Sequence, residues 1–145
     1  MAGKTGLAVL LLVAAALVPA GLFAQDPVTA KPDELTTSGN NIHAMASMIG
    51  IPGIPIAAML LSFSLWRTNP AWASHRSFVM ATAHATWISF ALMAVYMMWA
   101  VPRAGGFNAE VWAGWMNRMV VAAYITWQFA IAYRLIMNRT ARKAD

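Results

Sequence analysis

Four long apolar stretches alternate with shorter polar ones along the chain. The apolar stretches cover residues 6–24, 42–66, 78–100 and 111–137. Each reaches or exceeds the roughly 20 residues that an α-helix needs to cross a bilayer. A single open chain can satisfy its backbone polar groups in lipid only as a helix. The pattern therefore predicts an all-α membrane protein, in which residues 1–145 form one domain, a bundle of four transmembrane helices.

The composition supports this prediction and narrows the function. The chain is 60% hydrophobic and only 10% charged, whereas a soluble domain is roughly 25% charged. It has no cysteine, which excludes disulfides, thiolate metal sites and cysteine nucleophiles. The formal charge is +5, but most basic residues lie at the ends of apolar stretches. We therefore attribute the charge to orientation in the membrane and not to nucleic-acid binding.

The distribution of basic residues predicts the orientation. The termini and the middle connector hold most of them, whereas the other two connectors hold only Lys31 and Arg103. Cytoplasmic segments of membrane proteins are enriched in Lys and Arg. We therefore predict that both termini are cytoplasmic (N-in, C-in) and that the protein crosses a bacterial inner membrane several times. The predicted cytoplasmic set is Lys4, Arg67, Arg76, Arg139, Arg142 and Lys143, with Arg134 close to it.

The first apolar stretch allows two interpretations. Lys4, an apolar core and the small residue Ala20 also fit a signal peptide, with cleavage after Ala20. We expect a retained helix, and the orientation of the other three stretches is the same in either case.

Small residues form a stripe along the second stretch. Ala46, Gly50, Gly53 and Ala57 fall on one face of a helix. Small residues at this spacing let helix backbones approach closely, which is a main way for membrane helices to associate. We predict that this face packs against another helix.

Two prolines interrupt the same stretch, Pro52 and Pro55. A proline has no N–H and its ring displaces the carbonyl four residues earlier. The carbonyls of Met48 and Ile51 therefore lose their usual donors. The spacing predicts a helix that is bent near mid-depth, with the prolines on the flank opposite the small residues.

The third and fourth stretches each suggest an inward face. In the third, small and β-branched residues share a face with His84; in the fourth, Gly114 shares a face with Arg118. We expect both His84 and Gly114 to lie at helix contacts. Trp127 is on the side of its helix opposite to Arg118, where we expect lipid.

Three polar residues form a candidate ligand site near the predicted outer surface: His43, Asn117 and Arg118. An arginine inside a span is costly and usually faces a bundle interior or a wet cavity. Arg118 could instead extend toward the outer headgroups or make a structural hydrogen bond between helices. The three interpretations stay open at this point.

We do not expect a cofactor or a metal. His43 lies near the predicted outer surface and His84 near the inner one, so the pair cannot ligate one haem. The chain shows no Ser–His–Asp arrangement, glycine-rich phosphate loop or paired intramembrane carboxylates. This pattern favours a protein that is not an enzyme.

The layout resembles a bacterial multi-pass membrane family known as domain of unknown function nine-nine-eight. The similar features are an apolar span that ends in "GLFAQDP", a span opened by His43 in "IHAMASMIGIPGIPIAAMLL", and the last span, "WMNRMVVAAYITWQFAIAYRL", which carries Arg118. Family members have about six spans, so the resemblance covers the C-terminal part only. It implies function within an oligomer or a larger complex, and it implies no particular reaction.

Two hypotheses for function follow. The first is a structural or accessory subunit that packs on a larger membrane complex, or on copies of itself, through small-residue faces. The alternative is a small transporter or a lipid- or anion-binding protein with an outward-facing polar cavity.

Overall fold

The computed structural model describes residues 1–23, 38–108 and 110–144, with side chains as far as residue 137. Five helices form in this part of the chain: α1 (Ala2–Leu22), α2 (Ser38–Thr68), α3 (Pro70–Ala73), α4 (Arg76–Arg103) and α5 (Ala113–Ala144). Four are long and apolar enough to cross a membrane, namely α1, α2, α4 and residues Ala113–Met137 of α5. The predicted all-α architecture with four spanning helices is therefore confirmed.

The ends of the helices differ from the predicted stretches. Helices α2 and α4 extend beyond residues 42–66 and 78–100 at both ends, because polar flanking residues continue the helices. Helix α5 begins at Ala113 rather than at residue 111. The short helix α3 starts after Asn69, whose side-chain oxygen accepts a hydrogen bond from the N–H of Ala71 at 3.0 Å. This cap turns the chain from α2 into α4.

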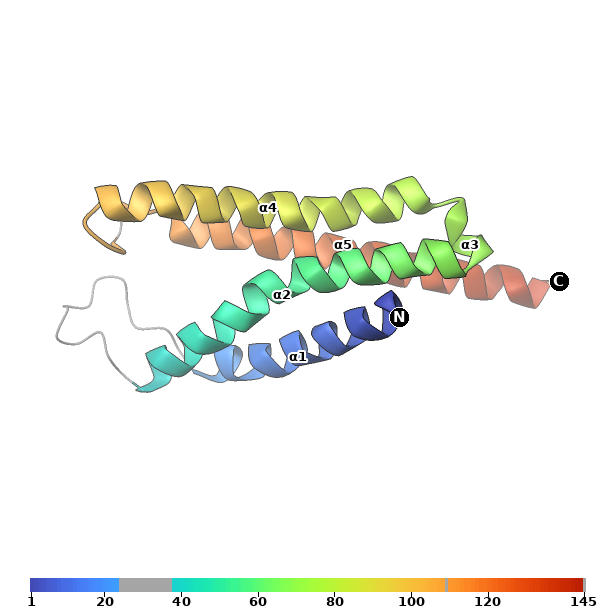
Figure 1. Ribbon diagram of the computed structural model, residues 1–145, viewed down its shortest axis with the longest axis horizontal. Helices are drawn as coiled ribbons and strands as arrows, with labels where there is room; N and C mark the ends of the chain where they lie inside the picture. Colours follow the sequence, from blue (N-terminus) through green and yellow to red (C-terminus); the bar gives the residue numbers. More distant parts are fainter. Residues whose placement is uncertain (24–37, 109, 145) are drawn as a thin grey trace.

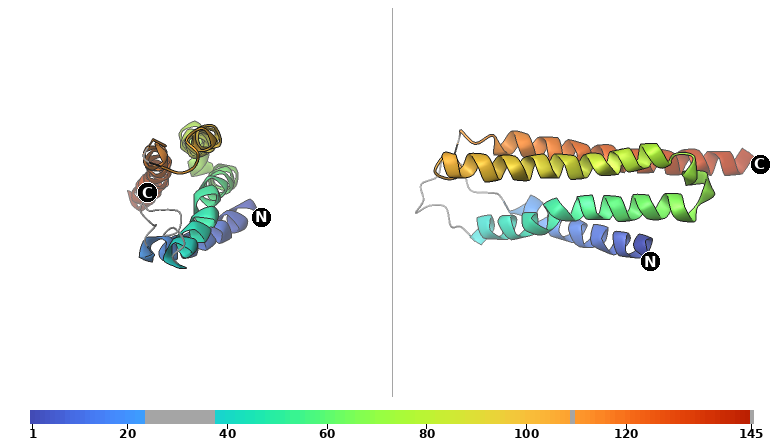
Figure 2. Two further views of the ribbon diagram at one scale, coloured as in Figure 1. Left: turned by 90° about the vertical axis from the view of Figure 1, so that its left-hand side faces the viewer. Right: turned by 45° about the horizontal axis from the view of Figure 1, so that its top comes forward.

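The four long helices are arranged as two antiparallel hairpins, α1–α2 and α4–α5 (Figure 1). Helix α2 joins the hairpins, mainly through its contacts with α4. Both chain termini lie at the same end of the molecule as α3 (Figure 2), and we call this the terminal end. The opposite end, where α4 connects to α5, is called the loop end.

The small-residue stripe of α2 is buried, and two of its glycines lie against α1. A methyl group added at Gly53 would overlap the side chain of Val13, and one at Gly50 would lie 2.9 Å from Leu17. Ala46 and Ala57 are buried as well. The other helix contributes Gly6, where a methyl group would meet Leu60 at 3.0 Å. The α1–α2 hairpin is thus held by backbones that approach closely at glycine.

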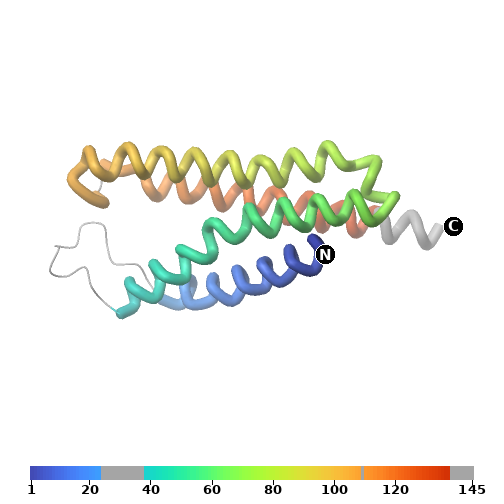
Figure 3. Tube along the Cα trace, viewed as in Figure 1, coloured from blue at the N-terminus to red at the C-terminus, as the bar shows by residue number. Residues whose placement is uncertain are grey.

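Helix α2 bends near its middle but stays one continuous helix (Figure 3). Pro52 and Pro55 lie at the bend. The hydroxyl of Tyr124 in α5 donates a hydrogen bond to the carbonyl of Ile51, which is the carbonyl that Pro55 deprives of its helical donor. Prolines are tolerated in membrane helices when a neighbouring group satisfies the freed carbonyl in this way.

A buried cluster connects the hairpins in the half of the molecule toward the terminal end. Trp127 of α5 packs with Ala58 of α2 and Ala83 of α4. Its indole N–H donates a hydrogen bond of 3.0 Å to the hydroxyl oxygen of Ser62, which is fully buried. The terminal-end half is therefore closed, with a polar contact inside an apolar core.

The prediction that Trp127 meets lipid is wrong, since only 2% of it is exposed. The buried face of α5 carries Val120, Tyr124, Trp127 and Ala130, and the face of Arg118 points outward. The physical reason is that an indole N–H and a phenol O–H need acceptors in a dry interior. Helix α2 supplies both acceptors.

The predicted inward face of α4 is also wrong. His84 is exposed, whereas Val79, Ala83 and Thr86 are buried. His84 satisfies one ring nitrogen locally, because Nδ1 donates to the carbonyl of Met80 at 2.6 Å. Gly114 is exposed too, and a methyl group there would meet nothing within 4 Å. Neither His84 nor Gly114 lies at a helix contact within this chain.

Candidate functional site: a cleft between the hairpins

A cleft of about 820 Å³ separates the two hairpins in the half of the molecule toward the loop end. It exists because the bend of α2 carries the first half of that helix, together with α1, away from α4 and α5 (Figure 1). A cluster of Val13, Ile54, Val120 and Tyr124 closes its deep end. Ligand sites in proteins typically have volumes of roughly 300–1,000 Å³.

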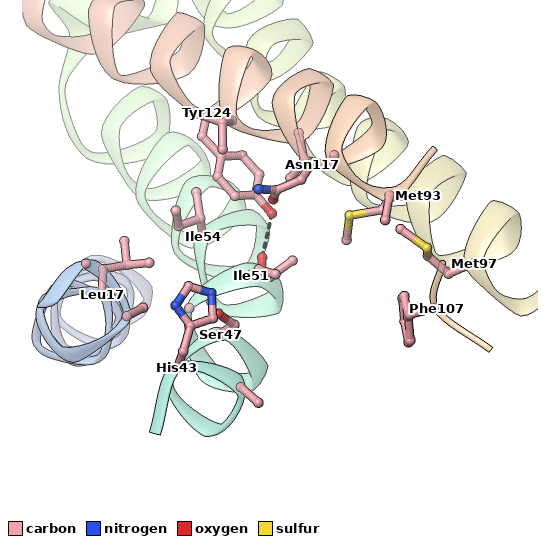
Figure 4. A pocket seen from close by; sticks show the side chains of 18 of the residues that line it. Leu17, His43, Ser47, Ile51, Ile54, Met93, Met97, Phe107, Asn117 and Tyr124 are labelled. Carbon is pink, nitrogen blue, oxygen red and sulfur yellow. Dashed lines mark hydrogen bonds between the residues drawn. The ribbon is translucent and has the colours of Figure 1, made fainter. Parts of the chain in front are cut away.

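The cleft is lined mostly by apolar side chains from all four long helices. Helix α1 contributes Leu17, and Met93 and Met97 of α4 lie on the far side with Phe107 of the loop (Figure 4). Methionine is unbranched and polarisable, so it adapts to ligands of irregular shape. The remaining apolar lining includes Ala20, Ala44, Ile51, Val111, Val121 and Ile125.

A few polar groups interrupt the apolar lining. His43 and Ser47 lie one turn apart on α2, and Asn117 and Gln128 belong to α5. His43 and Asn117 were predicted from the sequence to share one site, and the structure brings both to this cleft. Such a lining offers apolar contact along most of its area and hydrogen bonds at a few points.

His43 of α2 connects to the end of α1, and these two helices form one wall of the cleft. Its Nδ1 donates a hydrogen bond to the carbonyl of Phe23 at 3.0 Å. Phe23 is the C-cap residue directly after α1, so the imidazole satisfies a carbonyl that the helix leaves free. When Nδ1 donates, Nε2 of a neutral imidazole is an acceptor.

Asn117 carries an amide that makes no hydrogen bond to any residue in the described part of the chain. It projects from α5 beside Tyr124, toward Ile51 of α2 (Figure 4). It lies one turn inside the helix, roughly 6 Å from its start at Ala113. An amide with two donors and one acceptor oxygen is thus available to a molecule in the cleft.

Arg118 does not line the cleft. Its side chain is exposed, and the guanidinium carbon lies 5.2 Å from the centre of the Trp115 ring. A guanidinium over an indole face is a favourable cation–π arrangement at the membrane surface. The three predicted ligand residues are thus divided, with His43 and Asn117 in the cleft and Arg118 outside it.

The lining contains no Asp, Glu, Lys or Arg among the described residues. A charged ligand group would therefore lose hydration without gaining an opposite charge. The described residues also contain no group of three or more His, Cys, Asp or Glu that could hold a metal ion. The described lining thus offers hydrogen-bonding groups and apolar surface but no carboxylate, ammonium or guanidinium group.

Sequence reasoning missed Tyr124 and the apolar wall formed by Met93, Met97 and Phe107. A signal for Tyr124 was present, because Pro55 leaves an acceptor at Ile51 and the chain has only three tyrosines, whose long side chains carry an O–H donor. The methionines gave no signal, since the chain has 11 of them and most spans contain several.

Comparison with family models, with curated proteins and with solved structures found no match for this chain. The resemblance to the family of unknown function therefore stays a prediction.

Proposed function

We propose that this protein binds an uncharged amphiphile, such as a lipid with a neutral hydrogen-bonding head, in the cleft between its hairpins. The observation that carries the proposal is the free amide of Asn117 at the wall of a largely apolar cleft, whose described lining has no Asp, Glu, Lys or Arg. Asn117 is exposed in the cleft, and a ligand hydroxyl or carbonyl would pair with its amide. The apolar part of the ligand would lie against Leu17, Met93 and Met97.

This proposal modifies the second of the two functional hypotheses. A lipid-binding cavity is retained, whereas the anion is dropped because Arg118 points away from the cleft. The protein would hold or pass on a membrane-soluble molecule. We place it in a bacterial inner membrane, on the basis of its four apolar helices and the distribution of its basic residues.

The test measures binding of monooleoylglycerol and of oleate to the purified protein in mild detergent. We expect the neutral lipid to bind more tightly than the anion. Asn117→Leu should weaken monooleoylglycerol binding by about two- to tenfold, which corresponds to one lost hydrogen bond of roughly 0.5–1.5 kcal/mol.

The matched control is Thr126→Val, which removes a hydroxyl from the exposed face of α5, where it donates to the carbonyl of Ala122. This variant should bind like the wild type. Equal affinity for both lipids, or an Asn117→Leu protein with unchanged affinity, would show that the cleft does not act in this way.

A second candidate, an accessory subunit of a larger complex, is favoured by the outward face of α4. Ser77, Ala81 and Ala85 are exposed at intervals of one turn, and His84 lies beside them. Ionisable residues rarely face lipid, and small residues let a second helix approach. Isolation as a clean monomer in mild detergent, without a second membrane protein, would count against this candidate.

A further inference from the structure

Three arginines at the terminal end of the molecule each lie over an aromatic ring. The guanidinium carbon of Arg76 lies 4.3 Å from the ring centre of Trp66, and that of Arg134 lies 5.4 Å from the ring centre of Phe78. A third arginine, Arg67, lies over a ring of its own helix. The three arginines come from α2, α4 and α5, so the fold and not one local sequence motif brings them to this end.

Arg134 is held in place by the start of α4. Its Nη1 donates to Nε2 of His75 at 3.3 Å, and His75 is the residue directly before Arg76. Arg134 therefore lies against the residue that precedes α4 and against the ring of Phe78 in its first turn, while Arg76 belongs to that first turn and lies over Trp66. Because their positions are fixed by rings and by His75, they lose little conformational freedom when an anion binds.

Two buried donors at this end have no acceptor in the described part of the chain: Nε of Arg134 and Nε1 of Trp66. Unpaired buried donors are rare in folded proteins and need an explanation. Each belongs to a residue of the arrangement just described, since Trp66 packs under Arg76. The described residues thus leave two donors at this end without an acceptor.

Negative charge is also missing from this end among the described residues. Glu110 is the one acidic residue that the structure describes, and it lies at the loop end. The first turn of α4 contains no acidic residue, and its N-cap His75 makes no side-chain capping bond. The dipole of α4 therefore adds a partial positive charge that no described carboxylate offsets.

We propose that this end binds the phosphate of an anionic phospholipid, between Arg76, Arg134 and the start of α4. A phosphate matches guanidinium donors in charge and geometry. A lipid is favoured over a free anion because Phe78, 46% exposed, and the indole of Trp66 lie beside the arginines. Aromatic side chains are enriched at the headgroup level of membranes, where a lipid phosphate lies. The inference does not depend on the cleft.

The test compares retention of dioleoylphosphatidylglycerol and dioleoylphosphatidylcholine by the purified protein, using native mass spectrometry. We expect preferential retention of the anionic lipid. Arg76→Gln and Arg134→Gln should each weaken its binding by about fivefold, from the roughly 1 kcal/mol that one basic residue contributes near an anionic surface. Arg134→Lys should keep most of the binding, since it keeps the charge.

The matched control is Arg103→Gln. Arg103 lies 4.7 Å from the centre of the Trp99 ring and donates to a backbone carbonyl, so its chemistry is similar but it lies at the loop end. This variant should retain the anionic lipid like the wild type. Equal retention of both lipids, or equal losses in Arg103→Gln and Arg76→Gln, would overturn the proposal.

A further arm separates the lipid from free phosphate. Inorganic phosphate at millimolar concentration should not displace phosphatidylglycerol; if it displaces the lipid completely, the lipid assignment is wrong. If Arg134→Gln does not fold, as judged by circular dichroism, Arg76→Gln decides the outcome, because Arg76 is exposed.

Discussion

The hydroxyl of Tyr124 shows how a single side chain makes a proline acceptable inside a membrane helix. Pro55 removes the donor that the carbonyl of Ile51 would have in a regular helix, and Tyr124 replaces that donor from another helix. The same contact joins α5 to α2 at the deep end of the cleft. The Tyr124 side chain therefore satisfies a backbone carbonyl of α2, joins the two hairpins and shapes the deep end of the cleft.

This role predicts that Tyr124→Phe is destabilising. The expected loss in the free energy of unfolding is about 0.6 kcal/mol, the average for hydrogen bonds between membrane helices, and at most about 1.7 kcal/mol. Unfolding in mixed micelles with increasing sodium dodecyl sulfate measures it. Tyr133→Phe is the matched control, because Tyr133 is exposed on the same helix.

A double variant separates the backbone role of Tyr124 from simple packing. In a Pro55→Ala background, residue 55 regains an N–H that can donate to Ile51. The cost of Tyr124→Phe should then be smaller than in the wild type. An equal loss of stability in both backgrounds would mean that the hydroxyl does not compensate for the donor that Pro55 removes.

At the scale of the helix, α1 and α2 depend on glycine for their close approach. Gly53→Ala would place a methyl group into the side chain of Val13, and overpacking of this kind costs about 1–3 kcal/mol. We expect a lower midpoint of unfolding in the same micelle assay. The double variant Val13→Ala with Gly53→Ala should recover much of the loss, because it removes the overlapping group.

Gly114→Ala is the matched control for this prediction. A methyl group at Gly114 meets nothing within 4 Å, and alanine is the better helix former by about 1 kcal/mol. This variant should be neutral or slightly more stable. Equal destabilisation by both substitutions would contradict the role of Gly53 in packing.

The helices also show what could be predicted from the sequence and what could not. The number and positions of the spans follow from hydropathy, since only long apolar segments can cross lipid. The rotation of α4 and α5 about their own axes does not follow, because lipid and a protein interior are both apolar. Small residues near His84 and Gly114 therefore did not indicate the buried faces of α4 and α5. The glycines of α2 did indicate a buried face, which packs against α1.

The candidate site was predictable only in part for the same reason. His43 and Asn117 could be selected as polar residues within apolar stretches, and both line the cleft. Arg118 met the same criterion, but its guanidinium packs over Trp115, one turn away on the same helix. A local aromatic partner of this kind competes with a cavity, and sequence alone does not weigh the two.

At the scale of the whole molecule, both termini and α3 lie at one end. We predict that this end is cytoplasmic, because the sequence places most of its basic residues there. The chain has no cysteine, so single cysteines can report the orientation. A membrane-impermeant maleimide applied to intact spheroplasts should modify Glu110→Cys at the loop end. It should not modify Lys4→Cys or Ser74→Cys until the membrane is opened.

The reverse labelling pattern would invert the orientation and leave the fold unchanged. Modification of both ends from outside would instead indicate leaky spheroplasts, which a cytoplasmic marker enzyme checks.

The bend of α2 also sets how far the first half of this helix lies from α4 and α5. The segment from Ser38 to Ile51 lies beyond the bend and is roughly 20 Å long at 1.5 Å per residue. Leu17 of α1 packs against Gly50 within this segment. The first half of α2 and the second half of α1 therefore form one packed unit. A change of about 10° in the bend displaces the tip of a roughly 20 Å arm by roughly 3–4 Å. A small angular change at the two prolines would therefore produce a larger change in the width of the cleft.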